Sequence, residues 1–247
     1  MDASGYVAEV FRSIQGEGPY VGVLQVFVRF AGCSLRCAYC DTPRSRERTP
    51  QCSLGGGPEP RAVANPVHSR ELSSFIHFLA EASPGLHSVS LTGGEPLEQS
   101  EFLGALAEEI RKASLRVYLE TNGLFEDAAR AAAPLVDIVS MDIKLPSLCG
   151  GGDHFATYRR VLPLFRTREI FCKVVVARGF DTGEFEAAAR LVADFDPRTP
   201  FIIQPVTPNG SCEGVRGEDL MTSCLTAGAY LDDVRVIPQC HHVLGLE

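Results

Sequence analysis

The chain has 247 residues, 45% of them hydrophobic and 22% charged, with a formal net charge of −8, which fits one globular domain over residues 1–247 with a full core. An acidic chain without a dense run of Lys or Arg argues against nucleic acid as a main partner. No apolar stretch approaches bilayer length and no signal-like pattern opens the chain, so we expect a cytoplasmic protein with no membrane partner.

Strand-like and helical patterns alternate along the chain. The predicted strands are Val7–Phe11, Leu24–Phe30, Ser88–Leu91, Val117–Glu120, Ile138–Met141, Ile170–Val176, Phe201–Gln204 and Val234–Ile237. The predicted helices are Arg70–Ala82, Phe102–Ala113 and Glu184–Phe195, the last with Asp181 or Thr182 as its cap. Repeated strand–helix units predict an α/β fold with a mostly parallel sheet and right-handed crossovers.

One segment interrupts this alternation. Arg44–Pro66 is rich in Arg, Pro and Gly, includes Gly55-Gly56-Gly57, and has neither helical nor strand periodicity. Such a composition predicts a long, irregular loop insertion at about residues 43–66.

Three cysteines follow the second predicted strand in the pattern C-x3-C-x2-C. They are Cys33, Cys37 and Cys40, and Tyr39 directly precedes the last of them. Three thiolates this close can hold three corners of a cubane iron–sulfur cluster and leave the fourth iron without a protein ligand. Because a small molecule can bind an open iron and react there, the pattern indicates a catalytic cluster.

Two other uses of the cysteines are weighed against this one. Structural zinc prefers four ligands in paired units, and the other six cysteines are scattered singly, although Cys240-His241-His242 could complete a zinc site in an interaction module. A disulfide framework is disfavoured because the chain is long, the cysteine count is odd and no signal peptide is evident.

Polar motifs follow five of the predicted strands. These are the cysteine loop, Thr92–Pro96, Glu120–Gly123, Asp142–Lys144 and Gln204-Pro205. In parallel α/β barrels the chemistry gathers at the carboxyl ends of the strands, so we expect the five motifs to meet in one site. Within the second motif, Gly93 and Gly94 would let the backbone approach a ligand closely.

The cysteine pattern together with Thr92-Gly93-Gly94-Glu95-Pro96 resembles the signature of the radical S-adenosylmethionine (SAM) superfamily. This resemblance implies a partial TIM-type barrel, with parallel strands and outer helices, and a [4Fe–4S] cluster whose open iron is chelated by SAM. The segment Phe11–Pro19 further resembles the F-x-S-[IL]-Q-G-E-G motif of the 7-carboxy-7-deazaguanine synthase (QueE type) family, and Val26–Cys33 and Cys40-Asp41-Thr42 continue the match.

This family resemblance implies a carbon–nitrogen lyase of queuosine and 7-deazapurine biosynthesis. The expected reaction converts 6-carboxy-5,6,7,8-tetrahydropterin to 7-carboxy-7-deazaguanine with loss of ammonia, and SAM serves as a reusable cofactor. A flavodoxin or ferredoxin as electron donor and a homodimer are implied as well. The alternative within the superfamily is an activase that generates a glycyl radical on a partner protein, but that family lacks the combination of Q-G-E-G and F-[VI]-R-x-x-G-C.

The resemblance also implies residue roles. The pterin substrate is expected to contact Ile14, Gln15, Gly16, Glu17, Arg29 and Thr92, with Arg29 pairing with its carboxylate. Thr42 matches a Mg2+ ligand that Asp41 supports. SAM is expected to contact Tyr39, Gly94, Glu120, Asn122, Asp142, Ile143, Lys144, Gln204, Pro205, Val206 and Thr207.

Three of these roles stay open at this point. Many family members carry Ser-Pro-Lys where this chain has Asp142-Ile143-Lys144, which changes the geometry expected there. Glu120 and Asn122 either bind SAM or brace the sheet. Near the end of the chain, Gln239 or His241 either closes over the pterin or belongs to a structural cap.

Overall fold

The computed structural model describes residues 2–55, 60–150 and 152–246. Its strands are β1 (Ser4–Gly5), β2 (Val7–Ile14), β3 (Leu24–Phe30), β4 (Gln51–Leu54), β5 (Arg61–Ala64), β6 (Val67–His68), β7 (Ser88–Gly93), β8 (Val117–Thr121), β9 (Ile138–Asp142), β10 (Glu169–Val176), β11 (Phe201–Pro205) and β12 (Val234–Val236). Its α-helices are α1 (Ser69–Glu81), α2 (Ser100–Lys112), α3 (Glu126–Ala132), α4 (Pro146–Cys149), α5 (Phe155–Val161), α6 (Thr182–Phe195), α7 (Gly217–Gly228) and α8 (Cys240–Leu244). Short 3-10 helices are η1 (Gly18–Tyr20), η2 (Pro43–Arg46), η3 (Pro96–Gln99), η4 (Ala133–Leu135) and η5 (Leu162–Phe165).

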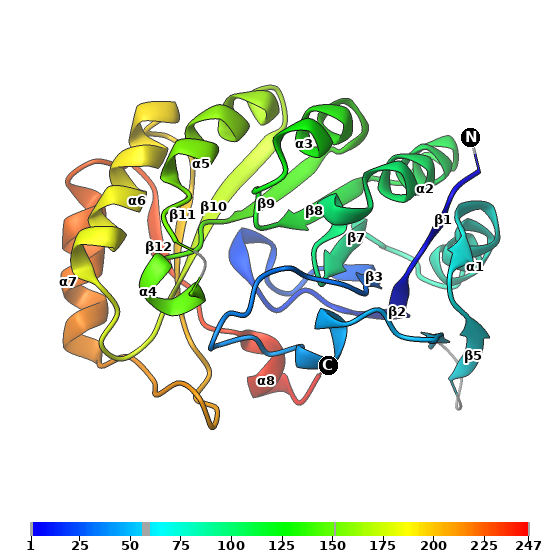
Figure 1. The fold of residues 1–247 in the computed structure, drawn as a ribbon, viewed down its shortest axis with the longest axis horizontal. Coiled ribbons are helices and arrows are strands. Elements are labelled where there is room, and N and C mark those ends of the chain that lie inside the picture. The colour runs from blue at the N-terminus through cyan, green and yellow to red at the C-terminus, as the bar shows by residue number, and fades with distance from the viewer. Residues whose placement is uncertain (1, 56–59, 151, 247) are drawn as a thin grey trace.

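The main sheet has the strand order β12-β11-β10-β9-β8-β7-β3-β2-β4-β5. The seven neighbouring strands β12, β11, β10, β9, β8, β7 and β3 are parallel, whereas β2 runs antiparallel to β3. The sheet begins at β12 and ends at β5 without closing, and α1, α2, α3, α5, α6 and α7 form an outer layer on its convex side (Figure 1). This arrangement confirms the expected partial barrel, as well as the eight strands and three helices predicted from periodicity.

The expectation of an irregular loop at 43–66 is wrong for much of that segment. It contains η2 and a hairpin of β4 and β5, in which β4 pairs in parallel with β2 through Glu9↔Ser53 and Val10↔Leu54. The physical reason is that the outer edge of β2 would otherwise expose unpaired backbone groups, which the hairpin covers. Residues 56–59, with Gly56 and Gly57, lie outside the described residues.

Alternation of side chains along the parallel strands separates an apolar face from a polar one. On β10, Cys172 and Val174 belong to the large core beneath the helices, while Phe171 and Lys173 face the concave side. On the other parallel strands, too, alternate residues belong to the core beneath the helices, so the residues between them face the concave side. This alternation aligns a row of polar side chains on the concave face, which includes Arg29 of β3, Thr92 of β7, Glu120 of β8, Asp142 of β9, Lys173 of β10 and Gln204 of β11.

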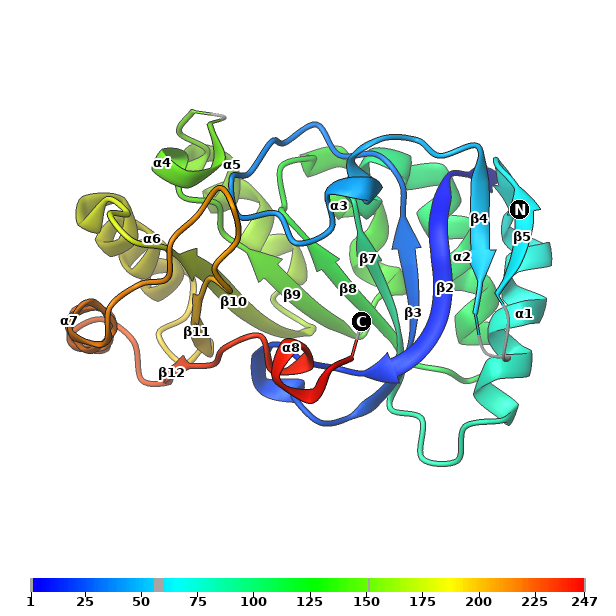
Figure 2. The same ribbon diagram turned by 90° about the horizontal axis from the view of Figure 1, so that it is seen from below.

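A small apolar cluster fills the concave face near the amino ends of the strands. Its buried members are Tyr118, Ile138, Phe171 and Ile202, and Tyr20 of η1 packs against them. The Tyr20 and Tyr118 rings meet edge to face with centroids 5.9 Å apart, a favourable aromatic geometry. This cluster closes one end of the barrel, so the polar row lies toward the carboxyl ends, where the cysteine loop crosses (Figure 2).

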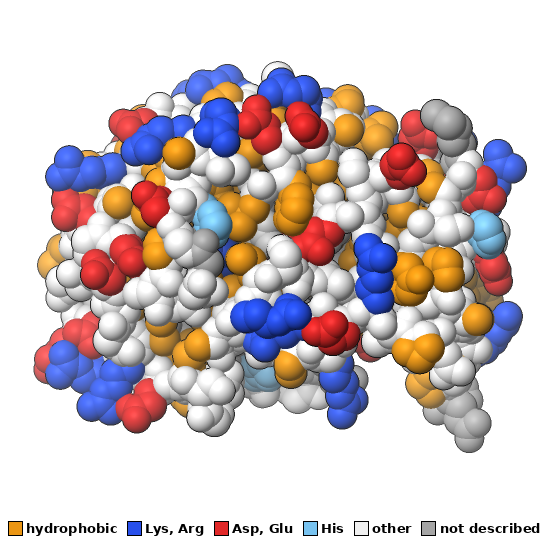
Figure 3. Space-filling model, viewed as in Figure 1, with side chains coloured by type: hydrophobic (Ala, Val, Ile, Leu, Met, Phe, Trp, Pro, Cys, Tyr) orange, Lys and Arg blue, Asp and Glu red, His pale blue; other side chains and the backbone are white. Residues whose placement is uncertain are grey.

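The surface shows no broad patch of one charge on the face seen in Figure 3, where acidic and basic side chains are interspersed. In the described ranges, no helix combines the length and the apolar character needed to cross a membrane.

Candidate active site

The cysteine loop leaves the carboxyl end of β3 and is fixed from both sides. The Cys33 N–H donates to the carbonyl of Arg46 at 3.0 Å, and the Arg46 guanidinium donates to the carbonyl of Cys37 at 2.6 Å. On the other side, the Ala38 N–H donates to the carbonyl of Leu148 at 3.1 Å. The loop is therefore held between η2 and α4, with Cys37 buried and Cys33 and Cys40 half-buried.

The donor set on this loop fits an iron–sulfur cluster. Three thiols lie within eight residues of one another, and the thiolate is the form that binds metal. A hydrogen bond with Cys149, helped by the charge of Lys144, lowers the pKa of Cys37 to about 6, whereas burial raises the pKa of Cys33 to about 11. The Cys149 thiol, which the cysteine pattern did not single out, also lies 3.3 Å from the Tyr39 hydroxyl.

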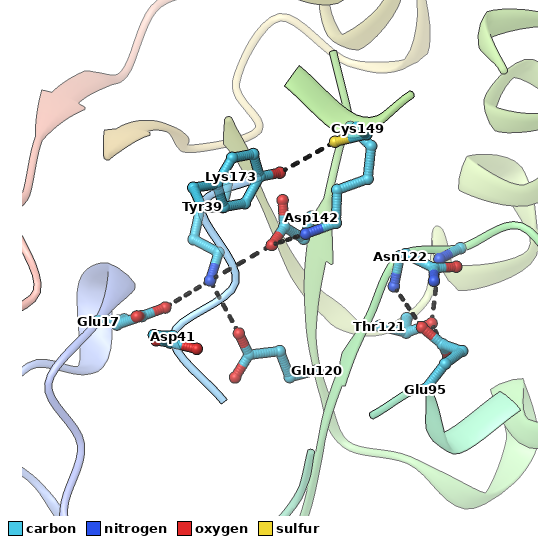
Figure 4. Close-up of polar contacts among 12 residues, drawn as sticks. Glu17, Tyr39, Asp41, Glu95, Glu120, Thr121, Asn122, Asp142, Cys149 and Lys173 are labelled. Carbon is cyan, nitrogen blue, oxygen red and sulfur yellow. Dashed lines mark hydrogen bonds and ion pairs between the residues drawn. The ribbon is translucent and has the colours of Figure 1, made fainter. Parts of the chain in front are cut away.

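Lys173 is the centre of a buried ion-pair network on the concave face (Figure 4). Its side chain is 4% exposed, and its ammonium contacts Glu17, Glu120 Oε1 at 2.8 Å and Asp142 Oδ2 at 3.6 Å. Burial alone would lower the pKa of Lys173, but Glu120, Glu17 and Asp142 hold it well above its usual value. The protonated form of Lys173 is therefore favoured, and its ammonium joins the predicted pterin residue Glu17 to the predicted SAM residues Glu120 and Asp142.

The same network reaches the neighbouring strands. The Thr92 hydroxyl donates to Glu120 Oε2 at 3.1 Å, so both carboxylate oxygens of Glu120 are engaged. Lys144 pairs with Asp142 at 2.7 Å and lies over the Tyr39 ring, 5.1 Å from its centroid. The structure thus brings Thr92, Glu120, Asp142 and Lys144 together as expected, and it adds Lys173, which the sequence patterns missed. The available signal for Lys173 was a single charge inside an otherwise apolar strand.

Three buried polar atoms on the concave side lack a protein partner among the described residues. They are Ser90 Oγ, Asp142 Oδ1 and Gln204 Oε1. Buried polar groups are normally hydrogen-bonded, so an orphan needs an explanation. Two of the three belong to predicted SAM residues, and both are acceptors, which suits a ligand that offers hydroxyl and amine donors.

Other predicted SAM residues contribute through packing or the backbone. Tyr39 packs against the buried cluster that contains Val206, so the cysteine loop and the end of β11 meet. The side chain of Ile143 is fully buried in the helix-side core, and its N–H donates to the Lys173 carbonyl. Only the backbone carbonyl of Ile143 is left for a ligand. Pro205 and Thr207 are half-buried beside these residues.

The glycines at the end of β7 are required by contact with the protein itself. A Cβ on Gly94 would lie 2.1 Å from the carbonyl oxygen of Gly32, and one on Gly93, whose φ is +100°, would lie 2.3 Å from Arg29 Cγ. Gly94 thus lets the end of β7 approach Gly32, which directly precedes the cysteine loop. The Glu95 N–H donates to the same Gly32 carbonyl at 2.8 Å.

We expect Gly94→Ala to displace the cysteine loop and to lower the free energy of unfolding by about 1–3 kcal/mol, because backbone must move to admit the methyl group. Gly104→Ala in α2 is the matched control. Its Cβ would meet Leu135 at an ordinary 3.7 Å, and Ala is the better helix former by about 0.5–1 kcal/mol. Urea unfolding compares the two, and equal stability of both variants would contradict the close-approach argument.

Glu95, the acidic residue of this motif, is buried and joins β7 to β8. It accepts from the Thr121 hydroxyl at 2.6 Å, the Asn122 N–H at 2.8 Å and the Leu97 N–H at 2.9 Å. Burial raises the pKa of Glu95 to about 7 despite these donors. The side-chain oxygen of Asn122 accepts from the Leu124 N–H at 3.1 Å, a contact that supports the bracing alternative for Asn122.

The predicted pterin residues lie along the β2–β3 pair, with Ile14 opposite Leu24 at one end and Arg29 opposite Glu9 at the other. The Gln15 amide donates to Gln25 Oε1 at 2.9 Å and accepts from the Glu17 N–H at 3.0 Å, so it shapes the turn through Gly16. Arg29 pairs through Nε with Glu9 at 2.7 Å. In the described part of the chain its terminal nitrogens make no hydrogen bond, and they stay available for a planar anion. Ile14 ends β2 next to this turn.

The C-terminal segment reaches back to this turn and to the cysteine loop. The Gln239 amide donates to Glu17 Oε1 at 2.8 Å and to Asp41 Oδ2 at 2.7 Å, and the Cys240 N–H donates to the carbonyl of Gly16 at 2.9 Å. Thr42, the predicted Mg2+ ligand, is half-buried directly after Asp41 and precedes η2. The C-terminal segment therefore joins the turn at Gly16 to the residue that follows the cysteine loop.

Comparison with known proteins gives concordant matches. The model of the radical SAM superfamily matches residues 27–191. A 7-carboxy-7-deazaguanine synthase of Geobacter sulfurreducens is 38% identical over 96% of both chains, and one of Methanothermobacter thermautotrophicus is 38% identical over 97% of both. Among solved structures, QueE from Escherichia coli matches with a TM-score of 0.65 and 24% identity, over 96% of this chain and 95% of that one.

Proposed function

Because the chain belongs to the radical SAM superfamily and, within it, to the family of 7-carboxy-7-deazaguanine synthases, we propose that it converts 6-carboxy-5,6,7,8-tetrahydropterin to 7-carboxy-7-deazaguanine with loss of ammonia. It is thus a carbon–nitrogen lyase of queuosine and deazapurine biosynthesis. The observation that carries this function is the similarity to named synthases over nearly the full length of both chains. When bound, the [4Fe–4S] cluster and SAM supply the radical that starts the ring contraction.

Cys33, Cys37 and Cys40 hold the cluster in this proposal. The support is their position on one loop fixed by η2 and α4, together with the low pKa of Cys37. Gly94 and Gly32 keep the end of β7 against that loop.

SAM lies along the ends of β7 to β11. Asp142 and Gln204 accept its hydroxyl and amine donors through the orphaned oxygens. Tyr39, Val206 and the backbone around Ile143 and Gly94 border it, with Lys144, Pro205 and Thr207 nearby. Glu120 and Asn122 act mainly by bracing this surface, since both use their side-chain oxygens within the protein.

The pterin lies over the turn at Gly16. Glu17, held by Lys173 and Gln239, accepts ring N–H donors, and Arg29 binds the substrate carboxylate through its terminal nitrogens. Ile14, Gln15 and Thr92 complete this pocket. The Lys173 network thereby fixes the pterin residues relative to the SAM residues. Catalysis by proximity requires that the two reactants be held in such a fixed geometry.

The decisive test of the function uses anaerobic protein with a reconstituted cluster. With the carboxypterin, SAM, Mg2+ and a reductant, we expect the deazaguanine product, one ammonia per turnover and recovery of intact SAM. The matched control omits the pterin. Cleavage of SAM without any product would favour the activase, and a colourless protein that holds zinc in place of iron would contradict both enzymes.

We also assign Mg2+ to Thr42, with Asp41 in support. A Thr hydroxyl beside the substrate carboxylate suits an ion that prefers oxygen ligands and keeps several waters. Thr42→Val keeps the side-chain shape and is expected to raise the Mg2+ concentration for half-maximal rate about tenfold, which corresponds to about 1.4 kcal/mol. Thr222→Val, at an exposed position of α7, is the control. The same Mg2+ response in both variants would remove Thr42 from the site.

The homodimer and the flavodoxin or ferredoxin donor are proposed from the family resemblance. Exposed Met221 and Leu225 on α7 provide apolar surface that a second copy would cover. Sedimentation at equilibrium tests the dimer, and a monomer at micromolar concentration would contradict it. Reduced flavodoxin and reduced ferredoxin, each supplied alone, should support turnover if the donor assignment is right.

A further inference from the structure

Three metal-binding side chains from opposite ends of the chain converge at the mouth of the site. Asp41 follows the cysteine loop, and His241 and His242 lie on α8, whose place across the concave side is seen in Figure 2. One oxygen or nitrogen atom from each of the three lies within 4.8 Å of the others. We propose that Asp41, His241 and His242 bind one divalent transition-metal ion of the zinc class.

The three side chains are held in place by contacts outside the ligand set. Gln239 donates to Asp41 Oδ2 at 2.7 Å, which orients that carboxylate and leaves Oδ1 for another partner. The Cys240 N–H donates to the Gly16 carbonyl at 2.9 Å and fixes the start of α8. Gly16 also gives His241 its room, since a Cβ there would lie 2.4 Å from His241 Nδ1.

The two imidazoles face each other without an internal hydrogen-bonding partner. Their ring centroids are 4.3 Å apart, and within residues 2–55, 60–150 and 152–246 neither ring makes a hydrogen bond. Two protonated rings at this separation would repel, whereas two neutral rings can direct lone pairs at one cation. The arrangement therefore matches neutral metal ligands better than a pair of charged surface residues.

The donor chemistry selects the type of ion. Two imidazole nitrogens and one carboxylate oxygen suit Zn2+, Co2+ or Ni2+, whereas Mg2+ favours oxygen ligands alone. Asp41 and His242 are exposed, so water can complete a tetrahedral shell. The zinc site that the sequence suggested at Cys240-His241-His242 therefore keeps its two histidines but exchanges Cys240 for Asp41. Cys240 Sγ faces the Pro238 carbonyl at 3.4 Å, and Asp41 takes the third place.

This site lies next to the proposed Mg2+ site, because Asp41 also supports Thr42 there, but its ligand set differs from those of the two metals already assigned. It uses none of Cys33, Cys37 and Cys40, and it does not include the Thr42 hydroxyl. A bound ion would tie α8 to the cysteine loop and add to the bridge that Gln239 makes. The proposal does not depend on the proposed reaction, because binding is measured without pterin or SAM.

The test uses anaerobic full-length protein with its cluster reconstituted, and Zn2+ alone as the probe. Competition with a chromophoric chelator gives affinity and stoichiometry, zinc-edge X-ray absorption gives the ligand atoms, and iron content reports on the cluster. We expect one Zn2+ per chain with nitrogen and oxygen ligands, imidazole scattering and unchanged iron. His242→Ala and Asp41→Asn should each weaken zinc binding by about tenfold or more.

His68→Ala is the matched control, because His68 is an exposed histidine on β6, remote in sequence from this site. It should bind Zn2+ as the wild type does. Sulfur scattering with loss of iron would mean that zinc had entered the cysteine loop, and would overturn the proposal. The absence of stoichiometric zinc binding would overturn it too. So would unchanged zinc affinity in His242→Ala and Asp41→Asn, once circular dichroism had shown both variants to be folded.

Discussion

Lys173→Met is expected to lower the free energy of unfolding by about 3–5 kcal/mol and to abolish formation of the deazaguanine product. The size of the effect follows from leaving buried charges without a partner. Lys173, whose side chain is 4% exposed, pairs with Glu17, Glu120 and Asp142, and without it the only cation left in this network would be Lys144, at Asp142. Product formation should fail because Glu17 and Glu120 would repel each other and leave their positions.

Anaerobic urea unfolding and product assays measure the two effects. Lys112→Met is the control, since Lys112 pairs with Glu109 on the surface and exposed pairs contribute little. Stability should return in part in the double variant Lys173→Met/Glu120→Gln, which removes one of the repelling charges. Full stability of Lys173→Met alone would mean that the carboxylates take up protons or water at little cost, and the network would lose its structural role.

Much of this site could be predicted because it rests on local patterns. A period of two fixes which side chain of each strand faces inward, and parallel strands bring their carboxyl ends to one edge. Thr92, Glu120, Asp142 and Gln204 were found from motifs at the strand ends, and Arg29 was found from the family resemblance. Lys173 obeys the same rule of alternation, but its role depends on three carboxylates from distant elements, which no pattern within β10 reports.

The parts that escaped prediction depend on contacts between distant segments. The strand β4 is short and has no clear alternation, and it forms because β2 offers it an edge. Helix α3 is rich in Ala, so it lacks large apolar residues at helical spacing, and α7 contains few buried residues. The five residues of α8 are placed by Gln239 and Gly16, at the other end of the chain. Periodicity in one segment cannot report such partners.

Cys37→Ala is expected to lose the iron–sulfur absorption, nearly all bound iron and all reductive cleavage of SAM. A cluster with an open iron has three protein ligands to begin with, so removal of one leaves too few to hold it. The nearby Cys149 makes this variant informative, because its thiol already contacts Cys37 and the Tyr39 hydroxyl. Cys149 is therefore the residue placed to substitute for the missing ligand.

Three further variants separate the possible roles of these thiols. Cys224→Ala, on α7, should keep iron and activity and controls for the loss of any cysteine. Cys149→Ala should also keep its iron if Cys149 only supports Cys37 through a hydrogen bond. If Cys37→Ala retains iron, the double variant Cys37→Ala/Cys149→Ala decides between rescue by Cys149 and a wrong assignment of Cys37. Iron that persists in the double variant would refute the cysteine triad itself, because the buried corner of the cluster would then have no thiolate.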